Sequence, residues 1–270
     1  TTFSQKRGYD LIFKDAQQQQ EQQIKAIRGF IQQDVNYIVL APVVETGWDT
    51  VLKEAKKAKI PVIIADRQVK VKDDSLYTTW VGADFYQEGQ KACSWMEQYA
   101  ERNKKKTLNI VHIMGTEGAT AQIGRTKALE EAAKKNGWNI LEQQTGAFTQ
   151  AKSHEVMEEY LKKYKDIDMV YCENDSEALG AIIISFDATR EGLAEVQNGK
   201  IAVDVECNPD FGKKIEKIIK QLEYKRDVNK EYYIGDKIYT QNKSISTIEI
   251  EKAKWSVTVV TDKIVKERVY

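Results

Sequence analysis

The chain has 270 residues, which is enough for about two domains or one large α/β unit. It carries 41 Lys and Arg residues against 41 Asp and Glu residues, so its formal net charge is zero and it lacks the positive field of a nucleic-acid-binding protein or a polybasic membrane anchor. Hydrophobic residues make up 41% of the chain and charged residues 30%, which excludes both a disordered chain and a membrane bundle. We expect a soluble globular protein with no nucleic-acid partner.

The ends of the sequence and its cysteines show no signature of a membrane segment, a disulfide framework or a metal site. No apolar run reaches the roughly 18 residues of a membrane-spanning helix, and residues 1–8 have no signal-peptide pattern, so the sequence is expected to be a mature or cytosolic form. Cys93, Cys172 and Cys207 are an odd, widely spaced set that indicates neither a disulfide framework nor a CxxC metal site. We expect them to be small buried hydrophobic residues, and we expect no metal site and no cofactor.

Short β-rich runs alternate with helical stretches along the whole chain, which predicts an α/β fold with parallel strands joined by crossover helices. Asp49 is the expected N-cap of the second helix. The strands are predicted at residues 10–13, 37–40, 62–65, 108–114, 169–171 and 182–186, and the helices at residues 21–33, 50–59, 86–102, 122–136, 154–163 and 212–222.

Polar residues follow most of the predicted strands at the point where each strand ends. Ligands of an open parallel sheet bind outside the carboxyl ends of its strands. A single Asp in such a place is more often the N-cap of the next helix, but five polar strand ends together indicate a ligand site. These residues are Asp15, Asp66 and Arg67, Gly115 and Thr116, Asn174 and Asp175, and Asp187.

The chemistry of this set favours a neutral sugar. A carboxylate accepts hydrogen bonds from two adjacent hydroxyls, a guanidinium donates through a fixed fork, and an amide does both. Arg67 and Arg125 could instead bind a phosphate or a carboxylate, although the neighbouring acids would repel such an anion. Aromatic rings could cover the C–H face of a sugar or belong to the core, and four lie near the predicted site: Phe3, Phe85, Phe148 and Phe186.

No catalytic constellation stands out in the sequence, and we expect no catalytic residue. His112 lies inside an apolar strand and is expected to be a core residue, whereas His154 lies on a polar helix. The HExxH, GxSxG and Walker motifs are absent. The Gly115 to Gly118 segment lacks the third glycine of a dinucleotide fingerprint. Asp66 and Asp187 could in principle form the acid pair of a glycosidase.

Several segments together resemble a known family. They are DAQQQQEQQIKAIRGFIQQDVNYIVLAPVVETGWDTVLKEAKKAKIPVIIADR, GTEGATAQIGRTKAL, YCENDSEALGA, ISFDATREGL and VDVECNP. The chain resembles the type I periplasmic binding proteins that serve ABC importers, and within them it is most similar to galactofuranose-binding proteins. The resemblance runs from Phe3 to about Phe211.

This resemblance implies two doubly wound parallel-sheet lobes joined by a three-stranded hinge, residues 1–84 plus 208–246 and residues 85–207 plus 247–270, with a monosaccharide bound in the cleft between them. It implies a monomer whose closed form is recognised by the importer's membrane subunits, exported to the periplasm or lipid-tethered outside the cell membrane. The ligand-binding residues that it implies are Asp66 and Arg67 from one lobe and Arg125, Asn174 and Asp187 from the other, with Ser4, Gln5, Asp15, Gly118 and Glu206 as weaker members.

Two connections are shorter than the family's fold requires. Only residues 6–9 separate the FSQ strand from the next strand, and the helix beginning near Ser176 runs directly into a strand at Ile182. Because a parallel crossover needs about a dozen residues, we expect family segments to be missing at about Gln5/Lys6 and Ile182/Ile183. The site set is then incomplete.

Three other functions fit part of the sequence. A sugar-sensing domain that signals to a kinase would carry the same residues. The effector core of a LacI-type repressor would too, but its basic helix-turn-helix is not seen. A sugar-acting enzyme would need a positioned acid and base, which the sequence does not reveal.

Overall fold

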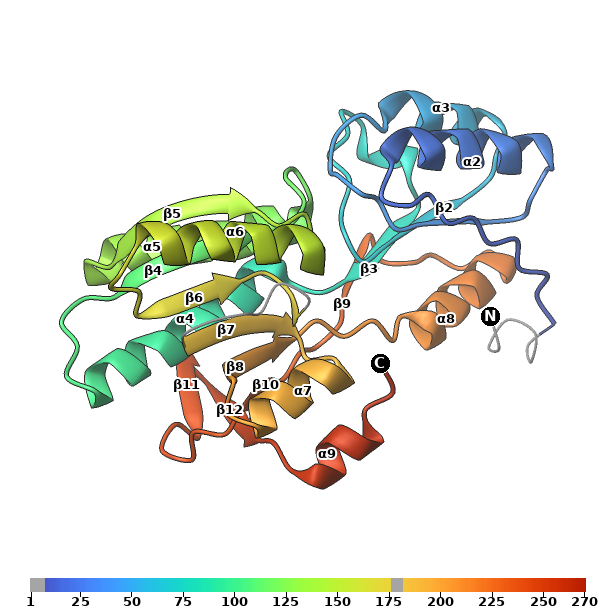
Figure 1. The fold of residues 1–270 in the computed structure, drawn as a ribbon. Helices are drawn as coiled ribbons and strands as arrows, with labels where there is room; N and C mark the ends of the chain where they lie inside the picture. The colour runs from blue at the N-terminus through green and yellow to red at the C-terminus, as the bar shows by residue number, and fades with distance from the viewer. Residues whose placement is uncertain (1–7, 176–181) are drawn as a thin grey trace. The chain divides into compact units, whose positions relative to one another are not determined.

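The computed structural model describes residues 8–175 and 182–270, and the chain divides into two compact units (Figure 1). The first unit contains Thr1–Gly82 and Pro209–Ile234, and the second contains Ala83–Asn208 and Gly235–Tyr270, so the chain passes between the units three times. Residues 235–246, which the sequence assigned to the first lobe, belong to the second unit. The reason is that β10 (Ile238–Thr240) pairs with β8 (Ile201–Glu206) of the second unit's sheet.

The first unit is a four-stranded parallel sheet with the order β1-β2-β3-β9. Its strands are β1 (Ile38–Leu40), β2 (Val62–Ala65), β3 (Thr79–Gly82) and β9 (Glu231–Tyr233), and its helices are α2 (Gln20–Gln32), α3 (Asp49–Lys57), the short 3-10 helix η1 (Asp74–Leu76) and α8 (Gly212–Glu223).

Strand alternation decides which helices cover which face of this sheet. Successive side chains of a strand point to opposite faces. Val62 and Ile64 pack in one cluster with residues of α2 and α3, whereas Ile63 between them packs with Ile218 of α8. Figure 1 shows α2 and α3 on one side of the strands and α8 on the other. The nearly continuous apolar run at 62–65 is thus a strand that is buried on both faces.

The strand predicted at residues 10–13 is wrong. No strand is assigned there, and the apolar side chains Leu11, Ile12 and Phe13 are 53%, 44% and 72% exposed. A strand exists only where its backbone bonds to a neighbour, and an apolar run cannot show by itself that such a neighbour is present. Asp49 is not an N-cap either, because it is the first residue of α3 and its carboxylate accepts from the Lys72 backbone N–H instead.

The second unit is built on an eight-stranded sheet with the order β11-β12-β10-β8-β7-β6-β4-β5. The five strands from β4 to β8 run parallel to one another. β10 runs antiparallel to β8. The remaining strands are β4 (Asn109–Met114), β5 (Asn139–Thr145), β6 (Met169–Cys172), β7 (Ile182–Asp187), β11 (Thr247–Ile250) and β12 (Ala253–Val259), and the helices are α4 (Phe85–Arg102), α5 (Thr120–Asn136), α6 (Gln150–Lys163), α7 (Arg190–Gln197) and α9 (Asp262–Glu267).

Two apolar clusters sandwich this sheet. One joins residues of α4 and α5 to alternate strand positions such as Ile110, Tyr171 and Phe186. The other joins α6, α7 and α9 to the intervening positions, among them Val111 and Val170. The α/β class predicted from the alternation of strands and helices is therefore correct, and so are the doubly wound sheets that the resemblance implies. The six predicted helices are also correct, to within a few residues at each end.

The connections that the sequence flagged as too short have separate outcomes. β7 includes both Ile182 and Ile183 and bonds to β6 through the pairs Met169/Ile182 and Val170/Ile183. The family segment expected to be missing at about this place stays a prediction. Gln5 and Lys6 lie outside the described residues. Within the described ranges, the helices are too short or too polar to cross a bilayer.

Candidate functional site

One edge of the second unit's sheet gathers polar residues from four strand ends. β8, β7, β6 and β4 are neighbours in the sheet and run parallel, so their carboxyl ends lie at the same edge. Gly115 follows β4 directly, and Asn174 comes two residues after the end of β6. Asp187 and Glu206 are the last residues of β7 and β8.

Arg125 of α5 is the centre of this edge. Its side chain is only 2% exposed, and its Nη1 donates to the Glu173 backbone carbonyl just after β6. Its Nη2 lies 3.7 Å from Asp187 Oδ1 at the end of β7. The guanidinium carbon also lies 4.5 Å from the centre of the Phe186 ring and 5.5 Å from that of Phe85, within range of cation–π attraction.

Glu88 of α4 is the buried hydrogen-bond partner of Arg125. Its Oε2 accepts from Arg125 Nε at 3.0 Å and from Nη2 at 2.8 Å, and its side chain is fully buried. Burial raises the pKa of Glu88 to about 8, although the attraction of Arg125 opposes that rise. Burial alone would lower the pKa of Arg125, but Glu88, Cys207 and Asp187 together raise it well above its usual value. The guanidinium therefore stays charged.

A second buried pair fixes the end of β6 next to Arg125. The Glu173 carboxylate accepts from the Gly115 backbone N–H at 2.8 Å and from the Thr126 hydroxyl at 2.8 Å. His112 Nε2 lies 3.1 Å from Glu173 Oε1, and Gln143 Nε2 lies 3.1 Å from His112 Nδ1. Since the Gln143 amide donates to Nδ1, we assign the ring proton to Nε2. His112 is thus a hydrogen-bonded core residue, as predicted.

Asn174 presents an amide that is nearly buried. It follows Glu173, and the residue is 9% exposed. Its Oδ1 receives no hydrogen bond from the residues that the structure describes. A buried carbonyl oxygen that accepts no hydrogen bond lowers the stability of the fold. Asn174 Oδ1 is therefore suited to accept a hydrogen bond from a hydroxyl group of a bound molecule.

Phe148 packs closely on the strand-end residue Gly115. A Cβ atom at Gly115 would lie 1.9 Å from the Phe148 ring, so only glycine leaves room for the ring in this position. Phe148 also groups with Phe85 in a small apolar cluster of the same unit. This part of the second unit therefore offers apolar ring surface beside Arg125 and Asp187.

In the first unit, Asp66 directly follows β2. Its backbone φ is +63°, which is unusual for a non-glycine residue. Its N–H donates to the Val81 carbonyl at 2.9 Å and its carbonyl accepts from Trp80 Nε1 at 2.8 Å. Arg67 Nε lies 4.0 Å from Asp66 Oδ2, and Arg67 Nη1 donates to the Val43 carbonyl at 3.2 Å. Both side chains keep partial exposure, 34% for Asp66 and 20% for Arg67.

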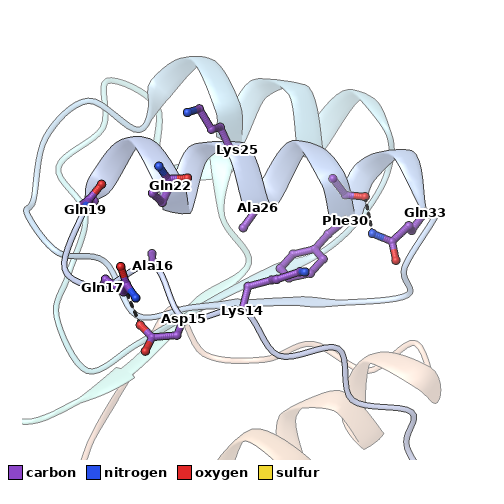
Figure 2. Close-up of a pocket in the computed structure, with 11 residues that line it drawn as sticks. Lys14, Asp15, Ala16, Gln17, Gln19, Gln22, Lys25, Ala26, Phe30 and Gln33 are labelled. Atoms are coloured by element: carbon purple, nitrogen blue, oxygen red, sulfur yellow. Dashed lines mark hydrogen bonds between the residues drawn. The ribbon is translucent and has the colours of Figure 1, made fainter.

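Asp15 lies apart from this pair in the first unit. Its Oδ1 accepts from the Gln17 backbone N–H at 2.8 Å. Figure 2 shows it at an open surface hollow between the segment around Lys14 and helix α2. Asp66 and Arg67 do not line this hollow. The structure therefore does not group Asp15 with Asp66 and Arg67.

The remaining expected residues have separate placements. Gly118 has φ +80°, and its N–H donates to Gln122 Oε1 at 3.2 Å just before α5. The Glu206 carboxylate accepts from the Lys237 N–H, the Tyr270 hydroxyl and Arg268, so the C-terminal segment bonds to it. Ser4 and Gln5 lie outside the described residues. In the described parts of the chain, no group of His, Cys, Asp and Glu side chains is arranged for a metal ion.

Sequence reasoning did not find the buried acids that support Arg125. Glu88 and Glu173 lie in a helix and just after a strand, where charged residues are ordinarily exposed. Lys91 and Asp236 form a further buried pair, 3.8 Å apart, and burial raises the pKa of Asp236 to about 6. Only the spacing of Glu88 and Lys91 on one face of a mostly apolar helix could have hinted at an inward-facing charge.

Comparison with known proteins places the chain among solute-binding proteins. Residues 2–210 match the periplasmic binding protein domain family. The galactofuranose-binding protein YtfQ of Escherichia coli is 47% identical over 203 residues, which are 73% of this chain and 63% of YtfQ, so the match spans less than two thirds of that relative.

Two solved structures are similar in both fold and sequence. One is a protein of Mycobacterium smegmatis in complex with β-D-fucofuranose, with a TM-score of 0.85 and 36% identity, covering 90% of this chain and 85% of that one. The other is the periplasmic binding protein of the arabinose ABC transporter from Shewanella, bound to α- and β-L-arabinofuranose, with a TM-score of 0.84 and 38% identity over the same shares of the two chains.

Proposed function

We propose that this chain, which belongs to the family of periplasmic binding protein domains, binds a monosaccharide in its furanose form and delivers it to an ABC importer. The observation that carries this proposal is the buried guanidinium of Arg125, held beside the Asp187 carboxylate and over the rings of Phe85 and Phe186. The sugars named for its similar relatives are galactofuranose, fucofuranose and arabinofuranose.

The geometry of the second unit suits a neutral polyhydroxyl ligand. Asp187 is one-third exposed and can accept from sugar hydroxyls, while the Asn174 amide offers both a donor and an acceptor. Arg125 already faces the buried acid Glu88 and the Asp187 carboxylate, and the negative charge of Asp187 balances its positive charge. An anionic ligand would have to approach these acids, which supports a sugar over a phosphate.

Asp66 and Arg67 of the first unit are proposed to bind the same sugar as Arg125, Asn174 and Asp187 of the second. A ligand that bonds to both units in a closed state and to one in an open state shifts the population toward closure. Binding changes no covalent bond of the sugar, so the protein acts as a carrier and not as an enzyme. The closed form is what the importer's membrane subunits would recognise, with the protein as a monomer.

Export is proposed on the basis of the family. A periplasmic binding protein meets its solute outside the cell membrane, either dissolved in the periplasm or held by a lipid anchor. Fractionation of cells that produce the full gene product tests this location, and recovery only in the cytoplasmic fraction would contradict it.

Ring-locked sugars test the ligand class by isothermal titration calorimetry. L-Arabinose, 5-deoxy-L-arabinose and 4-deoxy-L-arabinose form a matched set, because removal of the 5-hydroxyl prevents the pyranose ring and removal of the 4-hydroxyl prevents the furanose ring. We expect binding of the 5-deoxy sugar and none of the 4-deoxy sugar. The reverse result would contradict a furanose site, and binding of neither sugar nor of galactose or fucose would contradict the proposed function.

Substitutions test the residues. Asp66→Asn and Asp187→Asn keep the side-chain volume but leave hydroxyl donors with a weaker acceptor, and a hydrogen bond to a charged group contributes about 1.5–3 kcal/mol. We therefore expect each variant to lose at least about tenfold in affinity. Asp227→Ala, an exposed acid of the first unit, is the matched control. Affinities within about threefold of the parent would remove Asp66 or Asp187 from the site.

A further inference from the structure

The turn that carries Asp187 has a strained backbone. Asp187 has φ +100° and the next residue, Ala188, has φ +51°. Non-glycine residues rarely adopt positive φ, and such a conformation persists only where surrounding bonds enforce it. The aim of the Asp187 carboxylate therefore depends on what holds the backbone at residues 187–189.

Two acids hold this turn, the fully buried Asp204 and the partly buried Asp175. Asp204 of β8 accepts the Ala188 N–H at Oδ1, with a distance of 3.0 Å. Asp175, which follows β6, accepts the Thr189 N–H at 2.8 Å and the Thr189 hydroxyl at 2.6 Å, both at Oδ2. The two backbone N–H groups that follow Asp187 are thus each fixed by a carboxyl group from a neighbouring strand.

These two acids form a pair without a cation. In the described ranges, neither Asp175 nor Asp204 forms an ion pair with a Lys, Arg or His side chain, and Asp204 is fully buried. Asp204 Oδ2 has no hydrogen-bond partner among the described residues. The two carboxyl groups hold the N–H groups of consecutive residues, so they lie close together, and the charge of Asp175 acts on Asp204. Two neighbouring carboxylates with no cation beside them repel each other, and one proton shared by the pair would remove that repulsion.

Asp204 is the acid that carries the shared proton. Asp175 already accepts from the Ser185 hydroxyl at 2.8 Å as well as from Thr189, and it lies at the N-terminus of α7, which favours a negative charge. Within residues 8–175 and 182–270, Asp204 accepts from the Ala188 N–H alone. Burial and then the charge of Asp175 raise the pKa of Asp204 well above its usual value.

Two further titratable groups face this pair. Asp187 raises the pKa of Asp204 by its negative charge, and Tyr239 of β10 is the direct register partner of Asp204. Neither of these side chains neutralises a second negative charge. Loss of the shared proton would leave two neighbouring carboxylates, one of them fully buried, beside the turn that they hold.

We propose that Asp204 and Asp175 form a proton-sharing pair that positions Asp187 for sugar binding, so that the affinity for sugar depends on the proton held by Asp204. This inference rests on the proposed function, because it assumes that Asp187 contacts the sugar. Asp204 and Asp175 are positioning residues, since they act through the backbone at residues 188 and 189 and do not reach the sugar themselves.

Asp204→Asn and Asp204→Ala separate the proton from the mere presence of a side chain. An asparagine can keep the acceptor for the Ala188 N–H and supply a permanent donor to Asp175, whereas alanine removes both. With L-arabinose as the probe, we expect Asp204→Asn to bind within about threefold of the parent near pH 6 and Asp204→Ala to lose at least about tenfold. Circular dichroism melts establish that each variant is folded.

The dependence of sugar affinity on pH tests the proton itself, because a purely structural role of Asp204 would not change this dependence. Between about pH 6 and pH 9 we expect the parent to lose at least about fivefold more affinity than Asp204→Asn, because only the parent can lose the shared proton. Glu88 and Asp236 titrate in both proteins, so their effects cancel in this comparison. Parallel profiles would overturn the proposal, even if Asp204→Ala fails to fold.

Asp187→Ala distinguishes failure of this inference from failure of the proposed function. If Asp187→Ala binds L-arabinose as well as the parent does, the ligand assignment itself is wrong. If Asp187→Ala loses binding while folded Asp204→Ala keeps the parent's affinity, the sugar site stands and the positioning role is wrong.

Discussion

The buried pair of Glu88 and Arg125 makes the stability of the second unit depend on pH. The variant Glu88→Gln keeps the shape of the side chain and an oxygen that can accept from Arg125, but it removes the titrating group. Because the Glu88 side chain is fully buried and bonds to Arg125 at 2.8 Å and 3.0 Å, this variant isolates the effect of one buried charge.

The magnitude follows from the pKa of Glu88, which burial raises from an ordinary value of 4.5 to about 8. The folded state holds this proton more tightly than the unfolded state does. The free energy of unfolding of the parent therefore falls as pH rises from about 4.5 to about 8, by at most about 1.4 kcal/mol for each pH unit. The full loss is of order 5 kcal/mol, and Glu88→Gln does not suffer it.

Urea unfolding of parent and variant between about pH 5 and pH 9 measures this difference. We expect the stability of Glu88→Gln relative to the parent to increase steadily up to about pH 8 and then to level off. Glu97→Gln, a partly exposed acid on the same helix that pairs with Lys135, is the matched control and should show no such trend. A constant difference between parent and Glu88→Gln across the whole range would refute the reasoning.

Two glycine substitutions test the packing around the site. A methyl group at Gly124 would lie 2.8 Å from the Tyr86 backbone nitrogen, so Gly124→Ala should lower the free energy of unfolding by about 1–3 kcal/mol. The control is Gly29→Ala, at a helix glycine with open space around it. Equal urea midpoints for Gly124→Ala and the parent would contradict the expectation. Gly115→Ala should displace the Phe148 ring and reduce sugar affinity at least about tenfold by calorimetry, and unchanged affinity would mean that this ring does not cover the sugar.

The strand-end pattern predicted where several polar residues of the candidate site lie in the fold. Asp66 and Asp187 each end or follow a predicted strand, and the structure puts both at a strand terminus with an unusual backbone. The reason is topological: in a parallel sheet every strand delivers its last residue to the same edge. The prediction failed for Asp15, because it assumed a strand at residues 10–13 that has no partner in the structure.

The buried charges could not be read from the sequence. Glu88, Glu173 and Asp204 look like ordinary surface acids in their local segments, and their partners lie 37, 61 and 16 positions away or are other acids. Burial depends on which helix face or strand side is covered, and that is decided only when distant elements pack. The same limit applies to residues 235–246, which join the second unit through a strand pairing that no local pattern specifies.

The amino-acid sequence alone determined the α/β class and the order of most helices and strands, because periodicity and turn residues are local properties of the chain. The strand-end residues also led to the expectation of a sugar ligand. Tertiary structure decided which acids are buried, which of them hold Arg125 and the Asp187 turn, and where the boundary of the two units falls. These features depend on desolvation and on hydrogen bonds between segments far apart in the chain, and neither exists before the elements pack together.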